Sequence, residues 1–396
     1  MLPFEEARQR VLASVTTLPV ETVTLADAAF RVISADLIAT GNLPPFDYSA
    51  MDGYAIDSQK LDGEGPWSLR VAQEARAGSA IVRLEPKSAC RIFTGGPVPA
   101  GADTVVMQEN VERHDDTIRF SERPRAGQHI RRAGEDLARG AVALEAGTRL
   151  GPFQIGLIAA LDQATVKVRK RPKVAILCTG DELRTPGVAG QPGQIPDSNG
   201  PSLAVMARAA GASVVLLPTT GDDFEKTREA IRGALSESDV LVTVGGVSVG
   251  DYDVVRSALE AAGASLDFWK VRIKPGKPLV FGRAGTCFVL GLPGNPVSAQ
   301  LTFGLFGLPL LRKLEGDRHV LPRMSRARLQ APLRQKPGRL GFYGAVLDGD
   351  RAIVGKNQAS GAPTGMAFAQ ALVLVPAESE GYDAGAEVDV IELRDL

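Results

Sequence analysis

Between about residue 172 and residue 320, short apolar runs rich in β-branched residues alternate with longer amphipathic stretches. The runs predict strands and the stretches predict helices, at the spacing of βαβ units. Such units build a doubly wound α/β sheet with helices on both faces. The expected strands are Lys173–Cys178, Ser213–Leu217, Asp239–Val244 and Cys287–Leu290, and the expected helices are Pro201–Ala210, Phe224–Ser236, Tyr252–Ala262 and Pro296–Leu311.

Outside this segment the pattern changes. Residues 3–18 carry Phe4, Ala7, Val11 and Val15 at helical spacing and predict an amphipathic helix. Short alternating segments broken by Gly, Pro and Asp predict a β-rich domain, and similar segments after residue 321 predict a small β-barrel. We therefore expect an elongated domain (residues 1–44 and 141–171), an inserted β-rich domain (45–140), an α/β domain (172–320) and a C-terminal β-barrel (321–396).

Composition narrows the class of protein. A chain of 396 residues with 44% hydrophobic and 23% charged residues is typical of a globular protein of several domains. Its 45 basic and 46 acidic residues do not indicate general nucleic-acid binding. The three separate cysteines do not suggest a zinc site or disulfide framework. Without an apolar run of ~18 residues or a signal peptide, we expect a cytoplasmic protein with no membrane partner.

Glycine-rich polar loops follow three of the expected strands. In open α/β sheets, ligands bind at the carboxyl ends of the strands, where backbone N–H groups and helix N-termini attract phosphate. Carboxylates in two of these loops suggest a divalent cation such as Mg²⁺ beside phosphate oxygens. A plain strand-to-helix turn is the alternative for any one loop. The loops are Thr179-Gly180-Asp181-Glu182, Gly245 to Asp253, and Pro293-Gly294-Asn295 leading to Ser298.

No GxGxxG follows the first strand and no GxxxxGK[ST] is present, which disfavours a dinucleotide redox cofactor and a P-loop. Basic residues suggest an oxyanion instead. A single extended strand over residues 269–274 would place Lys270, Arg272 and Lys274 on one face, with Lys277 just after a Pro-Gly turn. The alternative is an exposed basic edge that deters strand pairing.

Taken together, these motifs resemble one known family. TGDEL, GQIPDSN, GGVSVGDYD, IKPGKP and LPGNPVS occur in this order, after PPFDYSAMDGYAID, IFTGGPVPAGADTVVMQE and IRRAGEDLARG. The set resembles the molybdopterin molybdenumtransferases, which are related to the E domain of gephyrin. The resemblance covers nearly all of residues 1–315.

The resemblance implies an activity. Members of this family take adenylylated molybdopterin and molybdate, hydrolyse the adenylate in a Mg²⁺-dependent step, release AMP and leave molybdenum on the dithiolene. It implies a molybdopterin-binding α/β domain, a homodimer formed through the elongated domain, and as further partners a molybdopterin adenylyltransferase and recipient molybdoenzymes.

The resemblance also assigns roles to residues. Asp52, Thr94 and Asp136 would act on the cleft of the opposite subunit, and Glu182 and Asp253 would hold the metal. The implied catalytic residues are Asp52, Thr94, Asp136, Glu182, Asp253, Lys270 and Lys274. The implied substrate-binding residues are Thr179, Gly180, Asp181, Asp222, Gly245, Gly246, Ser248, Gly250, Asp251, Lys277, Pro293, Gly294, Asn295, Ser298, Arg339 and Ser360.

Simpler roles and other functions stay open. Asp52 fits a turn, Thr94 a strand end, and Asp136 and Asp222 fit helix caps. In the C-terminal region, the family pattern R-x-[DE]-F-x-R has glycine at two of its places, Gly341 and Gly344. This departure motivates a second hypothesis, a non-catalytic scaffold or carrier for the cofactor. A third is an enzyme that inserts tungstate.

Overall fold

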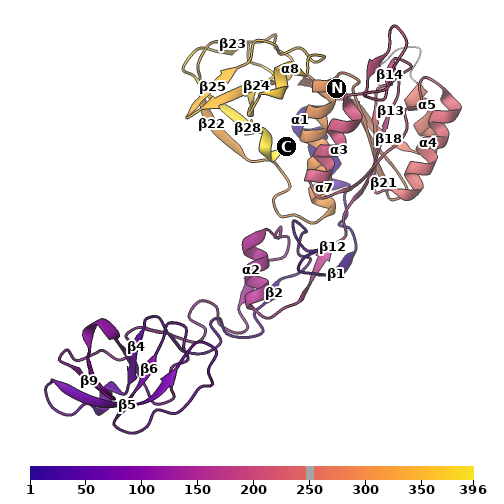
Figure 1. The fold of residues 1–396 in the computed structure, drawn as a ribbon. Coiled ribbons are helices and arrows are strands. Elements are labelled where there is room, and N and C mark those ends of the chain that lie inside the picture. The colour runs from indigo at the N-terminus through magenta and orange to yellow at the C-terminus, as the bar shows by residue number, and fades with distance from the viewer. Residues whose placement is uncertain (247–253) are drawn as a thin grey trace.

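The computed structural model describes residues 1–246 and 254–396. The chain is elongated (Figure 1). A β-rich domain lies at one end, a narrow linker region of residues 19–44 and 141–171 follows, and the α/β domain and a C-terminal barrel lie together at the other end. No helix within the described ranges is long and apolar enough to cross a membrane.

The α/β domain contains the expected doubly wound sheet, with strand order β16-β13-β17-β21-β20-β18. The first four strands in this order are parallel, β20 runs antiparallel to them, and β18 is antiparallel to β20. The four predicted strands are confirmed to within two residues, whereas β18 and β20 were missed. The strands are β13 (Lys173–Cys178), β16 (Ser213–Leu216), β17 (Val240–Val244), β18 (Ser265–Lys270), β20 (Pro278–Ala284) and β21 (Cys287–Leu292).

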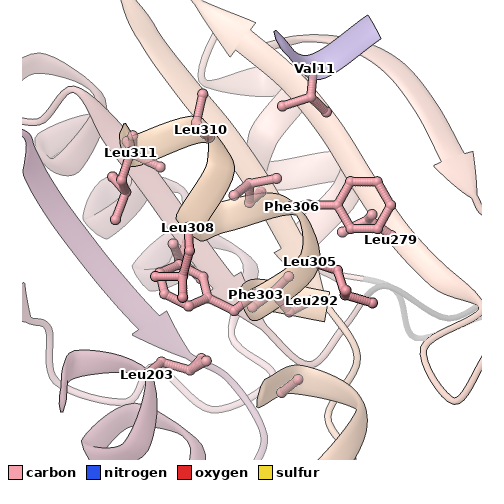
Figure 2. Packing of buried hydrophobic residues seen from close by; sticks show 14 of the residues in the cluster. Val11, Leu203, Leu279, Leu292, Phe303, Leu305, Phe306, Leu308, Leu310 and Leu311 are labelled. Atoms are coloured by element: carbon pink, nitrogen blue, oxygen red, sulfur yellow. The ribbon is translucent and has the colours of Figure 1, made fainter. Parts of the chain in front are cut away.

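Helices cover both faces of this sheet. Alternate residues of β13 enter the cores of opposite faces, which is why its sequence is a continuous apolar run. The larger core packs α1 (Phe4–Ala13) and helices α3, α6 and α7 against the sheet, and Figure 2 shows its Leu and Phe side chains around Phe303 and Phe306. The helices are α3 (Asn199–Ala209), α4 (Phe224–Glu237), α5 (Val254–Ala261), α6 (Pro296–Thr302) and α7 (Leu308–Leu314).

Two helix predictions differ from the structure. The helix expected over residues 296–311 contains a π-helical segment, η3 (Phe303–Gly307), and ends at Leu314. The helix expected over residues 3–18 is α1 (Phe4–Ala13); beyond it the chain turns so that Leu18 N–H donates to Leu314 O at 2.8 Å. This contact with α7 draws the chain away from the helical path.

The β-rich domain forms a six-stranded sheet of order β7-β4-β6-β5-β9-β8. Its strands are β4 (Gly53–Ile56), β5 (Trp67–Ala75), β6 (Ser88–Ile92), β7 (Thr104–Met107), β8 (Glu112–His114) and β9 (Thr117–Phe120), beside the short β3 (Tyr48–Ser49) and β10 (Ile130–Arg131) and the 3₁₀ turns η1 (Ser58–Lys60) and η2 (Gln108–Asn110). The linker region holds β1 (Val20–Thr24), β2 (Leu37–Ile38), β11 (Val142–Leu144), α2 (Pro152–Ala160) and β12 (Thr165–Arg169).

The C-terminal barrel is confirmed as a closed sheet, because β24 pairs with both β25 and β26. Its strands are β22 (Met324–Leu329), β24 (Leu340–Asp348), β25 (Arg351–Val354), β26 (Ala371–Val375) and β28 (Glu387–Glu392), with β23 (Leu333–Arg334), β27 (Gly381–Tyr382), α8 (Thr364–Ala367) and η4 (Leu393–Asp395) beside them. The short β19 (Ile273–Lys274) leaves the α/β domain and pairs in parallel with β24, which joins the two domains.

Candidate functional site

A cavity of about 950 Å³ lies between the carboxyl ends of the α/β strands and the C-terminal barrel. It gathers most of the residues that the sequence singled out in these two domains. From that set the cavity is lined by Thr179, Gly180, Glu182, Asp222, Gly245, Gly246, Lys274, Lys277, Pro293, Gly294, Asn295, Ser298, Arg339 and Ser360. Ser248, Gly250, Asp251 and Asp253 lie outside the described residues.

Close backbone approach shapes one wall of this cavity. Gly245 follows β17 with φ +90°, and a Cβ at this position would lie 2.7 Å from Thr179 O. A Cβ on Gly246, with φ +58°, would lie 2.4 Å from Val255 Cγ2. Any side chain here would clash and strain the backbone, so only glycine lets the two loops meet.

Carboxylates lie at the mouth of the cavity. Glu182 and Asp222 line it and are exposed, on the loops that follow β13 and β16. Asp181 does not line the cavity; its Oδ1 accepts the N–H of Asp222 at 3.1 Å and so shapes the loop. In the part of the chain that the structure describes, no group of three or more His, Cys, Asp or Glu side chains is placed to hold a metal ion.

Three cations face the cavity from two domains. Lys274 and Lys277 come from the β19 segment, and Arg339 from the start of β24. Within residues 1–246 and 254–396, none of the three forms an ion pair, so their charges are available to an anionic ligand. Oxyanions are bound by such convergent Lys and Arg groups.

The predicted continuous strand over residues 269–274 is wrong. Lys270 ends β18 in the α/β sheet, whereas Lys274 lies on β19 beside the barrel. Between them Val271 forms a bridge with Leu2, and Lys270 O accepts the Leu2 N–H at 3.1 Å. The chain therefore changes partners at this point, and Lys270 does not line the cavity.

The helix starts that the sequence predicted as phosphate sites already have acceptors. The N–H groups of Asn199 and Gly200, at the start of α3, donate to Asp197 Oδ1 at 2.9 and 3.1 Å. In the first turn of α6, Val297 N–H donates to Ser360 O at 3.1 Å. This contact brings a loop of the barrel onto the α/β domain. These three N–H groups are therefore used within the protein, while Lys274, Lys277 and Arg339 bring positive charge to the cavity.

Several lining residues were not predicted. Asn199 is 5% exposed, donates to Gly294 O at 2.8 Å, and its Oδ1 has no hydrogen-bond partner among the described residues. Tyr343 and Gln358 come from the barrel. Asn199 ends the GQIPDSN motif and was therefore visible in the sequence. Nothing local marked Tyr343 or Gln358, because they reach the cavity through the pairing of β19 with β24.

Asp52 and Thr94 form a second polar site on the β-rich domain. Asp52 Oδ1 accepts hydrogen bonds from the Thr94 N–H at 2.8 Å and from Thr94 Oγ1 at 2.9 Å. These two bonds, with nearby Arg91, hold the pKa of Asp52 below its usual value. Asp52 directly precedes β4 and Thr94 follows β6, two strands that Figure 1 shows at the opposite end of the molecule from the α/β domain. Asp136 is exposed, and its backbone N–H donates to Leu43 O at 3.1 Å.

The cysteines are buried and take no part in either site. Cys90, Cys178 and Cys287 are free thiols, and burial raises the pKa of each, that of Cys90 to about 11. Thiols of this kind stay protonated near neutral pH and pack as small apolar groups.

Comparisons with known proteins cover nearly the whole chain. Residues 2–161 match the MoeA N-terminal region (domains I and II), residues 175–313 a probable molybdopterin binding domain, and residues 326–393 the MoeA C-terminal region (domain IV). The molybdopterin molybdenumtransferase of Haemophilus influenzae is 41% identical over 350 residues, 86% of this chain and 85% of that protein. Molybdopterin molybdenumtransferase 2 of Mycobacterium tuberculosis is 36% identical over 404 residues, 98% of this chain and 99% of that protein.

A solved structure agrees with these relatives. The molybdopterin biosynthesis moea protein from Pyrococcus horikosii has a TM-score of 0.86 and 30% sequence identity, with 99% of each chain covered. The fold class and the resemblance predicted from the motifs are thus confirmed. The chain belongs to the molybdopterin molybdenumtransferase family, a family of transferases of molybdenum cofactor biosynthesis.

Proposed function

We propose that this chain inserts molybdate into adenylylated molybdopterin, with Mg²⁺ dependence and release of AMP. The observation that carries the proposal is the cavity of about 950 Å³ in which Lys274, Lys277 and Arg339 converge beside glycine-rich loops. Molybdate and the adenylate linkage are both oxyanions, which lysine binds as a point charge and arginine through its planar guanidinium.

The donor set suits Mg²⁺. This ion keeps several waters and takes one or two protein carboxylates together with substrate phosphate oxygens. Glu182 lines the cavity, and we propose that it holds the ion with Asp253, which lies outside the described residues. When bound, Mg²⁺ would neutralise phosphate charge and polarise the phosphoryl group.

In this proposal, different residues of the cavity bind different groups of the substrates. Lys274, Lys277 and Arg339 would hold the molybdate and phosphate oxygens, and the glycines at 245 and 246 let the substrate approach the backbone closely. Asn199 Oδ1 is an acceptor with no described partner, so it suits an N–H donor of the pterin. These contacts orient the adenylate and exclude water from the oxyanion.

The catalytic group comes from a second subunit in this proposal. The β-rich domain that carries Asp52 and Thr94 lies at the opposite end of the molecule from the α/β domain, which supports their action across a homodimer. Helix α2 supports the dimer as well, because it is apolar on all sides while only Ile158 is buried and Phe153 is 89% exposed. A helix apolar all round is stable when a partner covers it. Asp52, held ionised by Thr94, would act as a base on the attacking water of the partner subunit's cavity.

AMP release tests the proposal directly. Purified protein is given molybdate and adenylylated molybdopterin, with and without Mg²⁺, and both AMP and active cofactor are measured. We expect both products only with Mg²⁺. Absence of AMP would refute the enzymatic proposal and favour the cofactor carrier. Asp52→Asn should keep molybdate binding and lose AMP release, whereas a carrier has no turnover to lose.

The same assay, with tungstate competing against molybdate and the metal content of the product as readout, decides which oxyanion is inserted. The adenylyltransferase, the recipient molybdoenzymes and the cytoplasmic location stay predictions.

A further inference from the structure

An aromatic side chain of the barrel lies against one of the three cations. Lys274 Nζ lies over the Tyr343 ring, 5.8 Å from its centroid, and both residues line the cavity. Lys274 pairs in register with Gly341 in the β19–β24 ladder, and Tyr343 lies two residues further along the same strand. Side chains two residues apart share one face of a strand, so Tyr343 is on the face of Gly341.

The ring of Tyr343 is fixed by a buried polar contact. Its hydroxyl donates to Gln335 Oε1 at 3.1 Å, and Gln335 Nε2 donates in turn to Pro376 O at 2.8 Å. Tyr343 is 5% exposed and Gln335 is 9% exposed. Burial raises the pKa of the Tyr343 phenol, so it keeps its proton and remains a donor to the amide.

Gly341 is part of the same arrangement. A Cβ at this position would lie 2.3 Å from Gln335 Oε1 and 2.5 Å from Tyr343 Cε2. Because these two side chains fill the space, no carboxylate can extend from position 341 beside Lys274. The side chains of Tyr343 and Gln335 are neutral, and among the described residues Lys274 forms no ion pair.

We propose that Tyr343, held by Gln335, is a positioning residue for Lys274: its ring supports the ammonium group without neutralising it, so that the full charge faces a tetrahedral oxyanion in the cavity. A cation over an aromatic face is attracted by the ring, whereas a carboxylate in the same place would compete with the ligand. This inference rests on the proposed binding of molybdate in this cavity.

Calorimetric titration of the full chain with molybdate tests it. Tyr343→Leu removes the ring and should weaken molybdate binding about two- to fivefold, the fold-change of one cation–π contact. Tyr343→Phe keeps the ring and should bind within about twofold of the wild type, although it loses the hydrogen bond to Gln335. In turnover, Tyr343→Leu should raise KM for molybdate and leave kcat unchanged.

Tyr382→Leu is the matched control. Tyr382 belongs to the same core cluster of the barrel but does not line the cavity. The Tyr382→Leu variant should have a lower Tm and unchanged affinity for molybdate. The inference would be overturned if Tyr343→Leu left molybdate binding unchanged. It would also be overturned if Tyr343→Phe or Tyr382→Leu weakened molybdate binding as much as Tyr343→Leu does.

The two proposals fail in different ways. If the wild type binds molybdate but releases no AMP, the proposed reaction is wrong while the role of Tyr343 stands. If the wild type binds no molybdate, both are overturned.

Discussion

Arg149 joins the linker region to the α/β domain through two buried carboxylates at the end of α7. Its Nη2 lies 2.6 Å from Glu315 Oε2 and its Nε lies 2.9 Å from Asp317 Oδ2. The side chains of Glu315 and Asp317 are 2% and 6% exposed. Arg149→Met keeps the apolar stem of the side chain and leaves both carboxylates buried without this cation.

We expect Arg149→Met to lower the free energy of unfolding by a large amount. Removing one partner of a buried ion pair destabilises a protein by about 3–5 kcal/mol, because the remaining charge stays desolvated. In a domain of 150–250 residues, 1 kcal/mol lowers Tm by about 2–4 °C, so we expect a fall of about 6–20 °C. An exposed pair contributes only about 0–1 kcal/mol.

The loss of stability in Arg149→Met should change with pH in one direction, which follows from the pKa of Glu315. Burial raises the pKa of Glu315, and Arg149 opposes the shift. A carboxyl whose pKa is raised in the folded state favours folding below its unfolded pKa and loses that contribution as pH rises through the folded pKa. Without Arg149 the folded pKa rises further. The deficit of Arg149→Met should therefore shrink as the pH is lowered toward the unfolded pKa.

Calorimetric melting of the wild type, Arg149→Met and Arg318→Met checks the magnitude. Arg318 is the matched control, since it bridges the same two regions through an exposed pair with Glu145 at 2.6 Å. We expect Arg318→Met to melt within about 4 °C of the wild type. If Arg149→Met also melts within that range, or if its deficit grows at low pH, the reasoning from burial is refuted.

Three further predictions address the two sites and the dimer. Thr94→Val removes one of the hydrogen bonds that lower the pKa of Asp52, so the acid limb of the pH profile of AMP release should move to higher pH. An unchanged pH profile would argue against Asp52 as the base. Gly245→Ala should lower the free energy of unfolding by about 1–3 kcal/mol, measured by melting, and weaken molybdate binding, measured by titration. Gly285 also has a positive φ, but a Cβ there would have no atom within 4 Å, so Gly285→Ala should affect stability alone. Phe153→Ser should be monomeric in light scattering and should lose AMP release while keeping molybdate binding. A variant dimer as stable as that of the wild type would show that α2 does not form the dimer interface.

The α/β domain was predictable to a large extent, and the misses have physical causes. β13 and β17 were recognised because strands buried on both faces appear as continuous apolar runs. β20 begins at Pro278 and contains Gly282, which disturb the usual strand pattern. Periodicity placed Lys270 with Lys274, but the chain changes from one sheet to another between them. A local pattern reports the conformation of a segment and not the partner it pairs with.

The sequence by itself determined the loops at the carboxyl ends of the strands, because glycine requirements and strand patterns are local properties of the backbone. It also determined the family, through the order of its motifs. Only the tertiary structure decided that Tyr343 and Gln358 complete the cavity, that the helix starts already have acceptors, and that the β-rich domain carrying Asp52 lies at the opposite end of the molecule from the α/β domain. Each of these depends on pairing or packing between segments distant in the sequence, such as β19 with β24. Such contacts are selected by the fit of whole surfaces, and no short stretch of sequence encodes that fit.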